Sequence, residues 1–208
     1  MRNVKTAAIA CAIAGAVALA GSRAEARLID LHAGATAGGM TGWGTTTKTP
    51  DFFDHGKGGG VGFDVGLKLL IFDFSVNFFQ TFDSHGAAAT LTQFLLGTEV
   101  DLPVGNATLP NGQTRSIVRP GFAAGFGLGT PAPVSLPLTD SQLSHKGIVS
   151  EFKLAYEYFL NPFIGVGVEG DFGYHYFFGG MVGNASANDH SSGYHVIGLG
   201  TFTFHLGY

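Results

Sequence analysis

Apolar residues alternate with small or polar residues along most of the chain, and this period of two restricts its fold more than any other feature. Between residues 61 and 69 the odd positions are Val61, Phe63, Val65, Leu67 and Leu69, and the even positions are glycine, aspartate or lysine. A period of two places successive side chains on opposite faces of a β-strand. The segment therefore predicts a strand with one apolar face and one polar or glycine-rich face.

The same alternation recurs in seven other segments, each near the ~10 residues of a tilted membrane-spanning strand. The eight predicted strands are 28–37, 61–69, 72–78, 92–102, 116–128, 148–158, 163–176 and 194–208. Every charged residue inside them falls on the phase opposite to the apolar residues. These charged residues are Asp30, Asp64, Lys68, Asp73, Glu99, Asp101, Arg119, Glu151, Lys153, Glu157, Glu169 and Asp171.

Alternation alone fits both a soluble β-sandwich and a membrane barrel. Composition favours the barrel, because charged residues make up only 12% of the chain, about half the usual share. The connections also alternate between short, near Leu70-Ile71 and 160–162, and long, over 38–59, 129–147 and 177–193. Tyrosines gather at strand ends, as in an interfacial girdle. We predict an all-β fold, a closed antiparallel transmembrane β-barrel of eight up-and-down strands.

The N-terminus has the three parts of an export signal. Arg2 and Lys5 precede an apolar stretch over 7–20, which is followed by the small-x-small site Ala24-Glu25-Ala26. A second, less favoured site is 18–20. We expect residues 1–26 to be a signal peptide and residues 27–208 to form the barrel. The only cysteine, Cys11, lies in the predicted signal, so the barrel itself has no disulfide and no thiolate metal site.

The export signal, the eight alternating strands and the final strand together resemble the small outer-membrane β-barrels of Gram-negative bacteria, such as the OmpA membrane domain, OmpX and OmpW. The final strand carries Phe202, Phe204, Leu206 and Tyr208 at alternate positions. The resemblance implies insertion in the outer membrane, with outer-membrane lipid and the barrel-assembly machinery as partners. An extracellular ligand or surface partner is expected for the long loops. The low content of basic residues argues against nucleic acid.

The motifs in the sequence do not assemble a catalytic centre. Residues 165–170 match the pattern Gly-x-Gly-x-x-Gly, but they continue inside an alternating strand instead of opening a helix. Residues 189–192 read Asp-His-Ser-Ser, and adjacent residues rarely form a catalytic triad in space. We therefore predict no enzyme activity, no catalytic residues, no cofactor-binding residues and no cofactor.

Histidines are the candidates for metal binding. A symmetric last hairpin would bring His175 near His195 at the outer rim, and barrel closure would bring His32 near His205. Neither pair has a carboxylate or cysteine at a spacing that fixes a third ligand. We expect these histidines to join the polar network of the lumen, without a metal site.

Three functions remain open at this stage. The interior of an eight-stranded barrel is normally filled by side chains, which favours a structural or surface-interaction role through the extracellular loops, including residues 40–57 with Trp43 and Phe53. The alternative is a narrow channel or transporter for small hydrophobic molecules, as in OmpW-like barrels, because inward glycines and residues such as Leu91 and Ile197 suggest a partly apolar cavity. A lipid-modifying outer-membrane enzyme is third.

Overall fold

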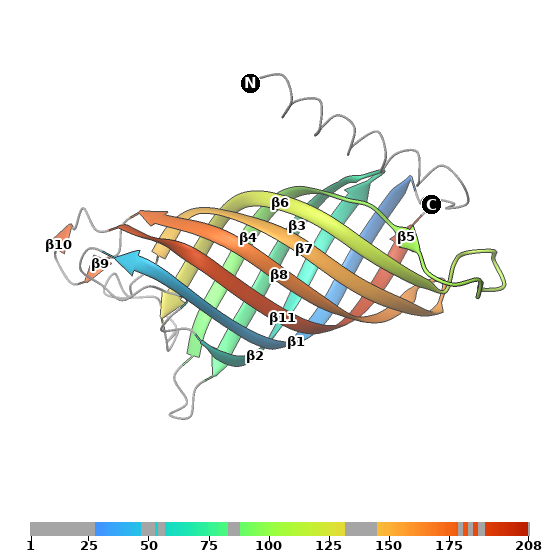
Figure 1. Ribbon diagram of the computed structural model, residues 1–208, viewed down its shortest axis with the longest axis horizontal. Helices are drawn as coiled ribbons and strands as arrows, with labels where there is room; N and C mark the ends of the chain where they lie inside the picture. Colours follow the sequence, from blue (N-terminus) through green and yellow to red (C-terminus); the bar gives the residue numbers. More distant parts are fainter. Residues whose placement is uncertain are drawn as a thin grey trace, which may run out of the picture.

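The computed structural model describes residues 28–46, 53, 57–82, 88–131, 145–178, 181–182, 185–186 and 190–207. The predicted signal peptide, residues 1–26, lies outside the described residues. Within the described ranges there is no helix that is long and apolar enough to cross a membrane. The described residues from 28 onward are organised around one β-barrel (Figure 1).

Eight long antiparallel strands form the barrel, and each pairs with its neighbour along the chain. The first and last of these strands also pair, over 17 residues of each, and so close the sheet. The predicted fold class is therefore confirmed. The long strands are β1 (Ile29–Thr46), β2 (Gly58–Leu69), β3 (Phe72–Phe82), β4 (Ala88–Glu99), β6 (Ser116–Pro131), β7 (His145–Asn161), β8 (Ile164–Phe178) and β11 (His190–Gly207).

Three short strands complete the described structure. β5 (Leu102–Pro103) adds two residues beside β6, and β9 (Met181–Val182) pairs with β10 (Ala185–Ser186). β5 lies at one end of the barrel and the β9–β10 pair at the other (Figure 1). We call the first the turn end, because the tight β2–β3 and β7–β8 connections are there, and the second the loop end.

The connections at the turn end are compact. Leu70 occupies the left-handed region with a φ of 58° in the β2–β3 turn. In the β7–β8 turn the side chain of Asn161 accepts hydrogen bonds from the backbone N–H groups of Phe163 and Ile164. The longer connection over 104–115 is held by a small cluster of Leu109, Ile117 and Phe159.

The strands extend further toward the loop end than the hydropathy pattern indicates. β1 continues to Thr46, whereas the sequence predicts a loop from residue 38, so Trp43 lies on a strand and packs against Tyr194 with ring centroids 6.2 Å apart. Residues 38–46 are mainly glycine and threonine, which give little hydropathic contrast. They form a strand because their backbone pairs with β11 as far as the Thr46–Ser191 pair.

The two phases of each strand separate as predicted. Large apolar side chains such as Phe74, Phe94 and Phe202 point outward with about half of their surface exposed, and the charged phase points into the lumen. Tyr174 and Tyr194 contact each other toward the loop end, while Tyr156 and Tyr158 lie nearer the turn end. A continuous apolar outer wall between aromatic bands is the surface of a transmembrane barrel.

This orientation gives a direct test at Val76, which lies near the middle of β3 and faces outward between Val65 and Phe94. A basic residue at the bilayer midplane costs about 2–4 kcal/mol. We expect Val76→Arg to lower the free energy of unfolding in lipid vesicles by about that amount, measured by urea titration. Val76→Leu is the control and should change it little. Equal stability of the two variants would contradict the assigned phase.

Candidate functional site in the barrel lumen

The lumen has three zones along the barrel axis. A network of ion pairs fills the turn end, an apolar and aromatic plug fills the loop end, and a small polar cavity lies between them. Each zone is built from inward-facing residues of several strands, so none of them is visible as a contiguous sequence motif.

The network at the turn end begins with His205 on β11, whose imidazole is almost fully buried. Its Nδ1 lies 2.7 Å from a carboxylate oxygen of Asp30, and its Nε2 lies 2.8 Å from one of Glu157. Both ring nitrogens therefore face acceptors, an arrangement that a doubly protonated imidazolium satisfies by donating both hydrogen bonds. The contact links β1, β11 and β7 across the point where the barrel closes.

Arg119 on β6 continues this network toward the opposite wall. Its guanidinium donates to Glu157 at 3.0 Å and to Asp101 at 2.8 Å, and Lys68 donates to Asp101 at 2.6 Å. Asp101 follows β4 at the turn end. Burial by itself raises the pKa of this carboxyl, but Arg119 and Lys68 outweigh burial and hold its pKa well below the usual value. The turn end is thus closed by charges that neutralise one another.

The plug at the loop end is centred on Phe53, from the connection between β1 and β2. Phe53 is fully buried and lies parallel to the imidazole of His195, with ring centroids 4.3 Å apart. Its ring also lies 4.7 Å from that of His175 and 6.1 Å from that of Phe177. The prediction that Phe53 belongs to an exposed binding loop is therefore wrong, because its ring is inserted among aromatic side chains of the lumen.

Hydrogen bonds among polar side chains hold the plug on the side that faces the centre of the barrel. His195 Nε2 lies 3.1 Å from Glu151 Oε1, and the Gln93 side-chain amide donates to the same carboxylate. Leu91 and Leu95, two of the inward apolar residues expected to line a cavity, instead pack tightly in this zone, whereas Ile197 packs on the plug and also lines the central cavity. The apolar part of the lumen at the loop end is therefore filled with side chains.

Several inward glycines leave space that a large side chain from another segment fills, and we call these positions sockets. A Cβ atom at Gly66 would collide with the imidazole of His32, one at Gly173 with that of His195, and one at Gly42 with Phe53. A Cβ atom at Gly165 would likewise collide with the Glu157 carboxylate. The expectation that missing side chains leave an open lumen is thus not met at these positions, because the space is used by rings and carboxylates across the strand.

The predicted histidine pairs do come together. His32 and His205 are register partners on β1 and β11, with ring centroids 6.3 Å apart. His175 and His195 are offset by two residues in the register, with centroids 5.7 Å apart. His190 begins β11 and contacts Tyr176 on the exposed side. Among the described residues, no group of three or more histidine, cysteine or carboxylate side chains is close enough to hold a metal ion directly.

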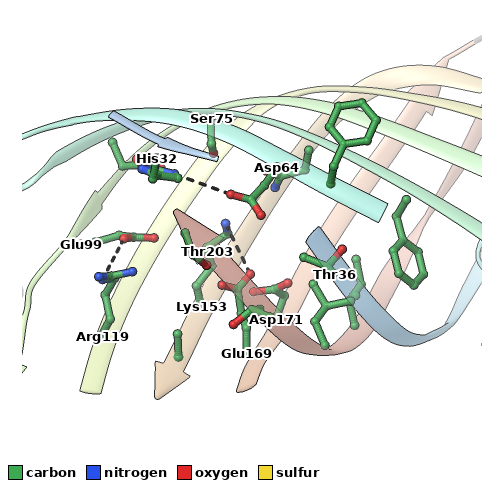
Figure 2. Close-up of a pocket in the computed structure, with 18 of the residues that line it drawn as sticks. His32, Thr36, Asp64, Ser75, Glu99, Arg119, Lys153, Glu169, Asp171 and Thr203 are labelled. Atoms are coloured by element: carbon green, nitrogen blue, oxygen red, sulfur yellow. Dashed lines mark ion pairs between the residues drawn. The ribbon is translucent and has the colours of Figure 1, made fainter. Parts of the chain in front are cut away.

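Between plug and network lies a cavity of about 70 Å³ (Figure 2). His32, Asp64, Lys153 and Glu169 surround it, with 3.9 Å between His32 Nε2 and an Asp64 oxygen and 3.8 Å between Lys153 Nζ and a Glu169 oxygen. Ile197 and Leu199 also line the cavity, so it is both charged and partly apolar, and the partly apolar character agrees with the prediction from the sequence. The sequence does not reveal this cavity as a motif, because its lining residues come from all eight long strands.

Comparison with known proteins gives similarity in fold only. No family model matches the chain, and no curated protein matches it. The N-terminal β-barrel domain of Pseudomonas aeruginosa OprF is 13% identical, with a TM-score of 0.43, over 84% of this chain and 97% of that one. Neisserial surface protein A is 15% identical, with a TM-score of 0.44, over 86% and 97%. The outer membrane protein OprG from Pseudomonas aeruginosa is 11% identical, with a TM-score of 0.36, over 86% and 95%.

The chain is thus a small eight-stranded β-barrel of the outer-membrane type, as the sequence resemblance implied. Its own strand pairing and its apolar outer wall carry this assignment.

The socket role of the glycines predicts that alanine substitution changes the stability of the barrel differently at two positions of β8. Gly173→Ala should destabilise the barrel by about 1–3 kcal/mol, because the added methyl group overpacks the site under His195. Gly170→Ala is the matched control, since nothing lies within 4 Å of the added atom, and it should leave stability unchanged or raise it by up to about 1 kcal/mol. Unfolding of both variants in the same detergent is the measurement, and equal destabilisation would refute the socket role.

Proposed function

We propose that this protein is an integral outer-membrane barrel that acts as a rigid scaffold for contacts at the cell surface, with a lumen that does not conduct. The observation that carries the proposal is the closure of the lumen at both ends. Phe53 and the histidines fill the loop end, and the network around Arg119 and His205 fills the turn end. The central cavity is too small to form a pathway by itself.

The differences between the turn end and the loop end of the barrel support one orientation of the barrel in the outer membrane. Both described chain ends, Leu28 and Gly207, lie at the turn end beside the tight turns. The segments 47–57, 83–87, 132–144 and 179–189 connect strands at the loop end. Short turns on the periplasmic side and longer connections on the outer side are the usual arrangement in outer-membrane barrels. We assign the loop end to the cell surface, where an extracellular partner would bind, and the turn end to the periplasm.

A transporter for small hydrophobic molecules has less support. Such a molecule would have to displace the packed plug and then cross a cavity whose lining is partly apolar but includes six carboxyl groups, and dehydrating these groups is costly. A lipid-modifying enzyme lacks a supporting feature in the described lumen and outer wall. We therefore propose a binding and structural role that is not enzymatic, with outer-membrane lipid and the barrel-assembly machinery as further partners.

Conductance tests the closed lumen. We expect the refolded protein to give no steady openings in a planar lipid bilayer, because the plug and the ion network both block the lumen. Phe53→Ala should also be silent, since the network around Arg119 remains in place. Flotation with liposomes and a heat-modifiable band on gels control for insertion and folding. Steady single-channel openings of the inserted wild-type protein would contradict the proposal.

Labelling of single cysteines tests the orientation. Lys146 is exposed at the loop end, and Asn111 is exposed at the turn end. In a Cys11→Ser background, we expect a membrane-impermeant maleimide to label Lys146→Cys in intact cells and to spare Asn111→Cys. Permeabilising the outer membrane should make both variants reactive. The reverse pattern in intact cells would overturn the assignment of the two ends.

A further inference from the structure

The outer wall of the barrel has an apolar groove on the face formed by β7, β8, β11 and β1. These four strands are neighbours in the sheet (Figure 1). The groove has a volume of about 800 Å³, within the ~300–1,000 Å³ of typical small-molecule sites. Its described lining holds no charged side chain. The groove therefore fits an apolar occupant, on the side of the wall that faces lipid.

The strand register forms this groove. Tyr156, Val168, Gly200 and Ala37 make one row of outward residues across the four strands. Tyr156 and Val168 form a wall, whereas Gly200 and Ala37 leave the backbone of β11 and β1 close to the surface as a floor. A Cβ atom at Gly200 would meet only the backbone oxygen of Ala37, at an ordinary 3.6 Å. Packing inside the barrel therefore does not require this glycine, in contrast to the sockets of the lumen.

The floor continues along the strands in both directions. Toward the turn end the next row ends in Phe202 and Ala35, and Phe202 is half exposed. Toward the loop end the next row contains Gly170, Gly198 and Gly39. A Cβ atom at Gly170 or Gly198 would meet nothing within 4 Å. The wall thus has a long low strip, a shape that suits an extended apolar chain.

A cationic side chain lies at the turn end of the groove. The half-buried Arg115 donates a hydrogen bond from Nη1 to the Tyr158 hydroxyl at 3.1 Å, and its Cζ lies 5.7 Å from the centre of the Tyr158 ring. Tyr158 itself lines the groove. Arg115 has no ion pair with a carboxylate among the described residues. A guanidinium has five N–H donors, so Arg115 can bind an anion at this end.

The tyrosines mark where the groove passes from lipid to the aqueous interface. The Tyr156 hydroxyl donates to Ser116 Oγ at 3.3 Å, so the hydroxyls of Tyr156 and Tyr158 are both held by residues next to the 104–115 connection. Tyrosine rings favour the membrane interface, with the ring in the apolar layer and the hydroxyl among the headgroups. The groove is therefore apolar along its length and cationic at the interface, which is complementary to an anionic amphiphile.

We propose that this groove binds one anionic phospholipid, with an acyl chain along Gly200 and Ala37 and the phosphate at Arg115. Arginine matches phosphate because its planar guanidinium donates two parallel hydrogen bonds. A second copy of the chain is a poorer occupant, since none of the described carboxylates is exposed to pair with Arg115. The location of this lipid in the periplasmic leaflet rests on the proposed orientation, whereas the site itself does not.

Native mass spectrometry tests the site on the mature protein refolded in a non-ionic detergent. We expect one molecule of phosphatidylglycerol to be retained per barrel. It should bind about fivefold more tightly than phosphatidylcholine, the effect of one basic residue near an anionic lipid. Equal affinity for the two lipids, or no lipid retained at a stoichiometry near one, would overturn the inference. The measurement depends on neither conductance nor orientation, so its failure would leave the proposed function standing.

Variants of Arg115 test the headgroup contact. Arg115→Gln should remove the preference for phosphatidylglycerol over phosphatidylcholine. Arg115→Lys keeps the positive charge and should keep most of the preference. A heat-modifiable band on gels checks that each variant is folded. A preference that persists in Arg115→Gln would show that the phosphate is bound elsewhere and would overturn the inference.

Variants of the floor test the chain contact. Gly200→Leu should weaken the binding of both lipids about tenfold, the effect of displacing roughly two CH₂ groups. Ala124→Leu is the matched control, because Ala124 points outward on β6 opposite Ser150, away from the groove lining, and it should bind as the wild type does. If Gly200→Leu does not fold, Ala37→Leu fills the same floor. Unchanged binding in the floor variants, or a wild-type dimer that Gly200→Leu dissociates, would overturn the inference, and the dimer would assign the groove to a second copy.

Discussion

The structure depends on one requirement, that every backbone N–H and C=O group on a wall facing hydrocarbon must be paired within the sheet. Lipid supplies no hydrogen-bonding partner, so an open edge is excluded and the first strand must pair with the last. Here β1 and β11 pair over 17 residues, from the Asp30–Gly207 pair to the Thr46–Ser191 pair at the loop end. Residues 38–46 form a strand although their hydropathy is weakly patterned, because their backbone pairs with β11 as far as the Thr46–Ser191 pair.

Closure with eight strands then restricts the interior. An eight-stranded barrel is just wide enough for side chains to fill, and this chain places rings and carboxylates there instead of small groups. Several of these large groups fit because a glycine faces them on the neighbouring strand, as Gly66 faces His32 and Gly173 faces His195. Part of the glycine content therefore serves packing in the lumen.

The electrostatics of the lumen follow from the same confinement. The charged side chains lie on the inward phase of the strands, so all of them point into one narrow lumen. There a charge that finds no partner raises the free energy of the folded barrel. At the turn end they pair, through Arg119, Asp101 and Lys68. In the centre, acidic side chains outnumber basic ones among the residues that line the cavity. Paired charges thus fill the turn end, whereas the centre retains an excess of carboxyl groups.

The sequence by itself determined the number of long strands, the faces of their central parts and the closed barrel, because a period of two and the placement of charges depend only on local chain geometry and on the lipid outside. The full length of the strands was not determined in this way, since residues 38–46 carry little hydropathic contrast. The sequence placed Val76 outward and Glu157 inward, and it brought His32 near His205 because closure pairs the first strand with the last. The partner of each inward residue was decided only by the tertiary structure. Register and strand tilt set which glycine lies under which ring, and they bring residues of all eight long strands to the lining of one cavity. Phe53 shows the same limit, since a phenylalanine in a loop sequence carries no sign of the aromatic pocket, built from distant strands, in which it is buried.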